Sequence, residues 1–119
     1  MYSTTLKWEK CQGNTWCDFL RLNLNHPHFD GLEGVYIIWH GGSQPRVVYV
    51  GQGLIADRLR EHRNDPAILQ YREFGLFVTW ARADAFSRPG VESFLAAQFQ
   101  PLVGERHPNV PQIAANLPW

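Results

Sequence analysis

The chain has no excess of charge of either sign. Its 11 lysine and arginine residues balance 11 aspartate and glutamate residues, so the formal net charge is zero and the pI is near 7.0. Proteins that hold long nucleic acids by bulk electrostatics usually show a clear basic excess. The balance argues against that class of protein but leaves room for a local basic patch.

Long hydrophobic runs, targeting signals and cysteine clusters are also lacking. No apolar run approaches the roughly 20 residues that a membrane-spanning helix needs, and the N-terminus lacks the basic and apolar segments of a signal peptide. We therefore expect a cytoplasmic protein with no membrane partner. The two cysteines, Cys11 and Cys17, have neither a zinc-binding nor a CxxC spacing, so we interpret them as buried or idle thiols.

The length and composition fit one folded domain. The chain has 119 residues, of which 45% are hydrophobic and 18% charged, and it shows no repeat, low-complexity tract or linker. These values predict a single domain with one hydrophobic core. Within it, residues 1–33 are expected to be a lead-in with a short helix over residues 16–22, and residues 34–118 the core.

Two apolar runs flank a short segment of turn-forming residues near the middle of the chain. Residues 34–39 and 47–51 are rich in β-branched and aromatic residues, and residues 40–45 between them contain two glycines and a proline. This pattern predicts a β-hairpin. The near-continuous apolar run over residues 75–81 predicts a third strand in a central position.

Helices are predicted after the hairpin and after the third strand. Residues 54–63 carry apolar residues at helical spacing, and Asp65 with Pro66 fits the start of a short helix that reaches residue 72. A longer helix is predicted over residues 87–99, followed by an irregular tail. Together these elements predict an α/β (α+β) fold with a small three-stranded, mainly antiparallel sheet flanked by helices.

Five side chains at specific points of these elements could share one chemical task. Tyr36 and Tyr49 lie on the hairpin, Arg58 and His62 share one helix face because they are four residues apart, and Glu92 lies near the start of the long helix. An arginine fork matches phosphate oxygens, and one carboxylate can hold a hard cation such as Mg²⁺. A tyrosine can act as a general base if neighbouring cations lower its pKa.

Each of these residues also has a structural interpretation. The tyrosines could be cross-strand aromatics on a half-buried sheet face. Arg58 could pair with Glu61 on the helix surface, and the helix dipole favours Glu92 near a helix start. The residue types alone leave both interpretations open.

Taken in chain order, the residues resemble the GIY-YIG nuclease superfamily. The resemblance rests on Gly34-Val35-Tyr36 and Tyr49-Val50-Gly51, with valine in place of the family's isoleucines, followed by Arg58, His62 and Glu92. It covers about residues 34–118. It implies a stand-alone, metal-dependent endonuclease that hydrolyses phosphodiester bonds in DNA, including branched or single-stranded DNA, with one Mg²⁺ or Mn²⁺ ion and a protein partner that supplies specificity.

The resemblance also implies a role for each residue of the set. Tyr36 would be the general base or would orient the attacking water, and Tyr49 would support it and contact the scissile phosphate. Arg58 would bind that phosphate and stabilise the transition state. His62 would assist proton transfer, and Glu92 would be the single carboxylate ligand of the metal.

Further residues would contact the substrate. Gly51 and Gly53 would allow close approach of the backbone, and the flanking Arg46 and Arg63 would add modest, salt-sensitive affinity for nucleic acid. The family's late asparagine matches either Asn109 or Asn116. We favour Asn116, because an extended tail could return it to the site.

Two other functions fit the same residues. A catalytically weak or inactive scaffold of this type could bind nucleic acid or a protein, which the neutral net charge and the lack of an appended DNA-reading domain favour. A small-molecule enzyme that uses the same tyrosine and arginine cluster is a weaker alternative.

Overall fold

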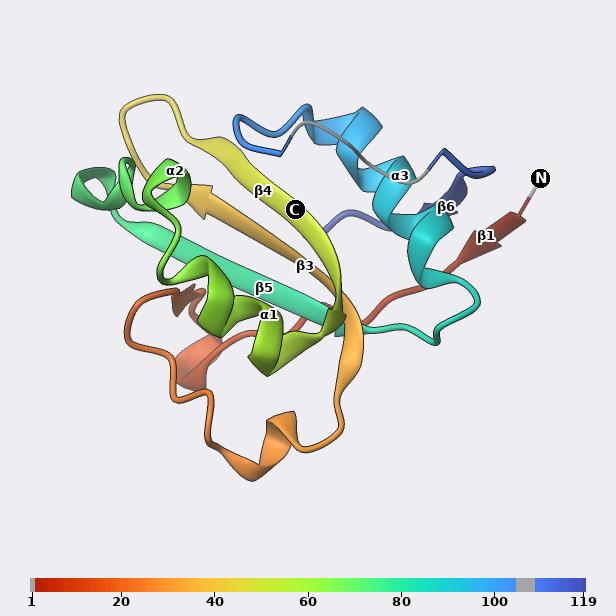
Figure 1. Cartoon of the computed structure of the whole chain (residues 1–119), viewed down its shortest axis with the longest axis horizontal. Coiled ribbons are helices and arrows are strands. Elements are labelled where there is room, and N and C mark those ends of the chain that lie inside the picture. Colours follow the sequence, from red (N-terminus) through yellow and green to blue (C-terminus); the bar gives the residue numbers. More distant parts are fainter. Residues whose placement is uncertain (1, 105–108) are drawn as a thin grey trace.

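A four-stranded antiparallel sheet forms the centre of this α+β protein (Figure 1). The computed structural model describes residues 2–104 and 109–119. The strands lie in the order β2-β5-β3-β4, and their bounds are β2 Cys17–Asp18, β3 Glu33–His40, β4 Arg46–Leu54 and β5 Leu76–Arg82. The three predicted strands are present, and β5 is an inner strand. The predicted count of three is inexact because the two-residue β2 joins the outer side of β5.

The hairpin of β3 and β4 fixes the register of the residues that matter later. Tyr36 pairs with Gly51, Ile38 pairs with Tyr49, and the register shifts at a bulge between Ile38 and Trp39. Successive residues of a strand point to opposite faces of its sheet. Tyr36 and Trp39 therefore belong to different faces, and their side chains pack in two different hydrophobic clusters.

Each face of the sheet is covered by different elements. The lead-in contains the short 3₁₀ helices η1 Gln12–Asn14 and η2 Pro27–Phe29. Its later part, from residue 17 to 32, shares the Tyr36 face with α1 Ile55–His62, α2 Pro66–Leu69 and η3 Arg72–Phe74, whereas its Leu6 and Trp16 pack on the opposite face. The opposite face is covered by α3 Arg88–Phe99, which buries Val91 and Leu95 against it. Figure 1 shows α1 and α3 on different sides of the hairpin.

The helix starts follow simple local chemistry. The Asp65 carboxylate accepts the N–H of Ala67 at 2.9 Å, and Pro66 occupies the first helical position, as predicted for α2. This helix ends at Leu69, earlier than the predicted residue 72, and the chain continues into η3. Ser87 precedes α3 but makes no side-chain cap. Its backbone N–H instead donates to the Asp84 carboxylate at 2.8 Å.

A second, two-stranded sheet joins the two ends of the described chain. In it β1 Tyr2–Thr4 pairs in parallel with β6 Ile113–Ala115. The side chain of Asn116 extends this pairing, because its Oδ1 accepts the N–H of Leu6 at 2.6 Å and its Nδ2 donates to the Leu6 carbonyl at 2.9 Å. The irregular tail predicted after residue 102 therefore contains a strand that the sequence pattern did not reveal.

The helix predicted over residues 16–22 does not form. Cys17 and Asp18 pair with β5 instead, and the Asp18 carboxylate accepts the N–H groups of Leu20 and Arg21, which turns the chain. Aspartate often competes for the backbone in this way and so disfavours a helix interior.

The prediction of idle thiols is also wrong, because Cys11 and Cys17 form a disulfide with their Cα atoms 5.1 Å apart. An isolated bridge between Cys11 and Thr15 brings the two cysteines together. Disulfides persist mainly in oxidising compartments. The cytoplasmic location stays a prediction.

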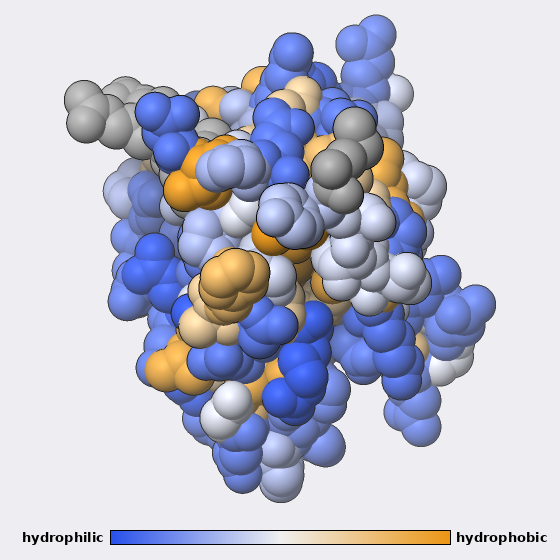
Figure 2. Space-filling model, turned by 90° about the vertical axis from the view of Figure 1, so that its right-hand side faces the viewer, coloured by the Kyte–Doolittle hydropathy of each residue, from blue (hydrophilic) through white to orange (hydrophobic). Residues whose placement is uncertain are grey.

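The outer surface is mixed in character. Figure 2 shows the face at the right of Figure 1, where hydrophobic residues are scattered among hydrophilic ones. The most exposed apolar side chains of the described residues include Tyr2 and Phe86. The longest helix in residues 2–104 and 109–119 has 12 residues, which is too short to cross a bilayer.

We predict that the disulfide stabilises the fold. Replacing both cysteines in Cys11→Ala/Cys17→Ala should lower the free energy of unfolding by about 2 kcal/mol, because the unfolded chain loses a cross-link over a short loop. Urea denaturation of the parent with and without dithiothreitol would measure this. Dithiothreitol should leave the free energy of unfolding of the double variant unchanged. Equal stability of oxidised and reduced parent would contradict the prediction.

Candidate active site at the hairpin and helix α1

A short hydrogen bond between Tyr36 and His62 lies at the centre of the site. The phenol oxygen lies 2.6 Å from His62 Nε2, and both side chains are buried. Tyr36 comes from β3 and His62 from the last turn of α1. Because α1 begins directly after β4, the helix is placed so that its His62 reaches the neighbouring strand.

Gly51 makes room for the Tyr36 ring. Tyr36 and Gly51 are paired residues of the hairpin, and a Cβ atom built on Gly51 would collide with the Tyr36 hydroxyl and Cζ. The phenol ring therefore packs directly on Gly51, and its hydroxyl reaches His62. The resemblance implied a close approach of substrate at Gly51, whereas the contact in the structure is with the protein's own tyrosine.

Tyr49 completes an aromatic cluster with these two residues. Its ring stacks on that of Tyr36 with centroids 6.1 Å apart and planes at 12°, and it lies 4.3 Å from the His62 ring. Unlike Tyr36, it is half-buried. Tyr49 thus forms the solvent side of the cluster.

Arg58 lies on α1 one turn before His62, beside Gly53. A Cβ atom on Gly53 would lie 3.2 Å from Arg58 Cγ, and Gly53 has φ +132°, which side-chain-bearing residues rarely adopt. The arginine stem therefore packs on the glycine. Its Nη1 pairs with the exposed Glu61 at 3.2 Å, the weak surface pair that the structural interpretation had suggested. The buried Nε of Arg58 has no hydrogen bond of good geometry among the described residues.

Glu92 brings a buried carboxyl to the same site from α3. It is 8% exposed. Burial raises its pKa to about 7, and the charge of Arg58 acts in the opposite direction. Glu92 also acts electrostatically on both tyrosines. The carboxyl and the charge of Arg58 therefore act on each other, although the two residues lie on helices that cover different faces of the sheet.

Burial controls the protonation of the aromatic cluster. It raises the pKa of Tyr36 well above its usual value, and the lowering effect of Arg58 does not compensate. It also lowers the pKa of His62 to about 4, with a further lowering by Arg58. At neutral pH the pair is therefore a neutral phenol and a neutral imidazole. A tyrosine that acts alone as a general base needs a lowered pKa, so a base at this site must act through the Tyr36–His62 pair.

The structure brings Tyr36, Tyr49 and His62 together beside Arg58, and Glu92 acts on them electrostatically from α3. It gives other partners to most of the predicted substrate-binding residues. Arg63 donates to the carbonyls of Phe19 and Leu22 at 2.6 to 3.0 Å and so ties α1 to the lead-in. The side-chain amide of Asn116 is hydrogen-bonded to the backbone of Leu6, next to the second sheet. Asn109 is exposed.

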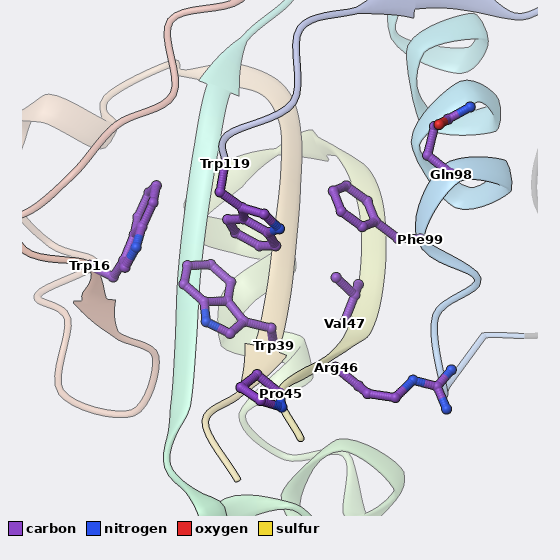
Figure 3. Close-up of a pocket in the computed structure, with 8 residues that line it drawn as sticks. All are labelled: Trp16, Trp39, Pro45, Arg46, Val47, Gln98, Phe99 and Trp119. Atoms are coloured by element: carbon purple, nitrogen blue, oxygen red, sulfur yellow. The ribbon is translucent and has the colours of Figure 1, made fainter. Parts of the chain in front are cut away.

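Arg46 lies at the turn end of β4, where it pairs with His40 in the hairpin register. Its Nη2 donates to the Gln100 carbonyl at 3.3 Å. The same arginine lines an aromatic pocket on the Trp39 face (Figure 3). Sequence reasoning assigned no function to this pocket. The one available signal was the five tryptophans in 119 residues.

Glu92 offers one carboxylate ligand, which suits only a metal site whose other coordination positions are filled by water or substrate. No group of three histidine, cysteine, aspartate or glutamate side chains that could hold an ion occurs within residues 2–104 and 109–119. A single carboxylate is compatible with Mg²⁺, which keeps several waters and takes substrate phosphate oxygens as further ligands. The raised pKa of Glu92 fits this, because a cation would stabilise the ionised carboxylate that burial disfavours. The residues therefore fit a metal that is shared with a substrate.

Comparison of the chain with models of protein families, with characterised proteins and with solved structures found no match. The interpretation of the site therefore depends on its own geometry and on the sequence resemblance.

We predict that Gly51→Ala destabilises the protein through Tyr36. The added methyl group would displace the phenol from His62, and overpacking of this kind costs about 1–3 kcal/mol. The cost should be smaller in a Tyr36→Leu background, where the colliding atoms are absent. A double-mutant cycle in urea would measure the coupling, and equal costs in both backgrounds would contradict this account.

We predict that Glu92→Gln stabilises the protein at alkaline pH. The folded-state pKa of about 7 lies above the ordinary value of 4.5. The contribution of the carboxyl to stability is therefore complete below pH 4.5 and is lost as the pH rises through 7. The gain in melting temperature from Glu92→Gln should be small near about pH 5 and large near about pH 8.

The pH series has a built-in control. Glu61→Gln alters an exposed carboxyl of α1 and is measured in the same series as the control. If the difference in melting temperature between Glu92→Gln and the parent stays constant with pH, this carboxyl ionises as easily in the folded protein as in the unfolded chain.

Proposed function

We propose that the protein is a GIY-YIG-type endonuclease that hydrolyses phosphodiester bonds in DNA. The observation that carries this proposal is the convergence of the Tyr36–His62 hydrogen bond, the Arg58 guanidinium and the Glu92 carboxyl on one site. These groups can together move a proton, bind a phosphate and bind a cation. The sequence resemblance gives the same residues in the same order.

Arg58 is the group suited to the scissile phosphate. Its stem is fixed against Gly53, and it makes an exposed ion pair with Glu61. A guanidinium can exchange such a weak partner for two phosphate oxygens, and it stabilises the charge that develops on them during attack.

The Tyr36–His62 pair can accept the proton of an attacking water. With the imidazole proton on Nδ1, the phenol donates to Nε2 across 2.6 Å. Water then gives its proton to the phenol oxygen while the phenol proton moves to Nε2, which leaves a hydroxide equivalent, a neutral tyrosine and a charged imidazolium. A phosphate on Arg58 offsets the positive charge that lowers the pKa of His62, so substrate binding strengthens the base.

Glu92 would hold the divalent ion, Mg²⁺ or Mn²⁺. Such an ion, when bound, supplies positive charge to the phosphate and leaving oxygens. The role of the protein is to keep one buried carboxylate next to the position of the phosphate on Arg58.

A second function is favoured by the burial of Tyr36. Its side chain has no exposed surface, and Tyr49 lies on its solvent side. A scaffold that binds nucleic acid or a protein without cleaving DNA would need no access of water to the phenol. Loss of cleavage with retention of binding distinguishes this alternative.

We predict metal-dependent nicking of DNA that depends on these residues. With Mg²⁺ or Mn²⁺, Tyr36→Phe and Arg58→Ala should each slow cleavage of supercoiled plasmid, branched DNA or single strands by about a hundredfold or more, because one loses the proton path and the other the phosphate ligand. Gel assays of initial rate would measure this.

Arg72→Ala is the matched control for charge, because Arg72 is exposed in η3 and away from the cluster, and it should cut at the parental rate. If no substrate is nicked, or if Arg58→Ala and Glu92→Ala cut as fast as the parent, the proposal fails.

A further inference from the structure

A second site lies on the face of the sheet opposite Tyr36. A cavity of about 470 Å³ opens between the turn end of the hairpin, the end of α3 and the last residues of the chain. Figure 3 shows three tryptophans and a phenylalanine along it. The lining residues are Trp16, Trp39, Pro45, Arg46, Val47, Gln98, Phe99 and Trp119.

The aromatic rings come from four separate segments and brace one another. Trp39 and Trp119 lie with centroids 4.7 Å apart, Trp16 meets Trp39 edge-on at 5.2 Å, and Phe99 lies 5.5 Å from Trp119. Edge-to-face contacts of this kind fix ring orientation. The wall of the cavity is therefore preformed.

This wall is not a closed part of the core. Trp119 is 55% exposed although it packs against Trp16, Trp39 and Phe99, so these rings form a contiguous apolar wall that is open to solvent. The indole N–H groups of Trp16, Trp39 and Trp119 donate to no acceptor in the described part of the chain, whereas those of Trp8 and Trp80 do. The cavity thus offers flat apolar surfaces together with unused donors.

Arg46 carries the one charged side chain among the residues that line the cavity. It makes one long hydrogen bond, to the Gln100 carbonyl, and no ion pair with the described residues. The lining contains no acidic side chain. A quaternary ammonium ligand would be repelled by Arg46 and would find no gap between rings that already touch. A neutral sugar would leave the charge of Arg46 unused.

We propose that this cavity binds one nucleotide of a single-stranded nucleic acid. The base would stack on the exposed Trp119 and its neighbours, and the adjoining phosphate would pair with Arg46. Stacking of bases on aromatic side chains beside a basic group is a general mode of single-strand binding. A duplex would be excluded, because its bases are already stacked and paired.

This site is separate from the cluster around Tyr36. Tyr36 and Trp39 lie on opposite faces of β3, and no residue is shared between the two sites. Binding here needs neither a metal nor cleavage, so it goes beyond the proposed nuclease function and can be tested independently of it.

The test is the binding of labelled oligonucleotides by the whole chain in the presence of EDTA, measured by fluorescence anisotropy. The probes are oligo(dT) and oligo(rU) of about ten nucleotides, within the usual site size for single-strand binders, and a duplex of similar length. We expect single strands to bind more tightly than the duplex, and the two single-strand probes show whether DNA or RNA is preferred.

The variants separate stacking from charge. Trp119→Ala should weaken single-strand binding by between about fivefold and a hundredfold, which corresponds to the loss of one stacked base. Arg46→Gln should reduce the slope of log affinity against log salt by about 0.7, the value for one phosphate contact on a single strand. The matched controls Phe86→Ala and Arg72→Gln alter an exposed aromatic and an exposed arginine outside the cavity and should bind like the parent.

Unchanged binding by a folded Trp119→Ala protein would overturn the proposal, as would equal affinity for the duplex. Quenching of tryptophan fluorescence by tetramethylammonium or by an oligosaccharide, with none by oligo(dT) or oligo(rU), would assign the cavity to another ligand. The nicking assay with metal tests the nuclease proposal and the anisotropy assay in EDTA tests this one, so a failure of either proposal gives a different result.

Discussion

Two contacts of Tyr36 fix the arrangement of the whole site: its ring packs on Gly51 and its hydroxyl is hydrogen-bonded to His62. These contacts join β3 to β4 and both strands to α1, so the positions of three elements depend on a phenol that fits only over a glycine. Arg58 lies on the same helix, one turn earlier, and is placed by the same constraint. A residue with a side chain at position 51 would therefore alter the fold and the chemistry together.

The low polarity around these contacts sets the charge state of the site. Burial keeps the phenol and the imidazole neutral and makes the Glu92 carboxyl reluctant to ionise. Arg58 is then the main fixed charge near them, and it acts on each of the other groups. Such a site is poised for an anionic ligand, because an anion on Arg58 changes the protonation of its neighbours without any movement of the backbone.

Local patterns predicted the hairpin, α1, α2 and α3, because these elements depend on alternation, helical spacing and caps that neighbouring residues supply. They failed for residues 16–22, where Asp18 turns the chain, and for β1 and β6, whose pairing joins segments more than a hundred residues apart. The five residues proposed to be catalytic could be selected because their order in the chain resembles that of a family. The roles of Arg63 and Asn116 could not be predicted, because they depend on carbonyl and amide groups of distant loops.

The pairing of β1 with β6 also has a consequence for the order of folding. The hydrogen bonds between Leu6 and Asn116 join residues that are 110 positions apart in the sequence, whereas the hairpin strands are joined by a short turn. Loop closure becomes entropically more costly with length, so distant strands pair more slowly than neighbouring ones. During synthesis β1 has no partner until β6 has left the ribosome. The hairpin and α1, and with them the Tyr36 site, can therefore form before β1 and β6 pair.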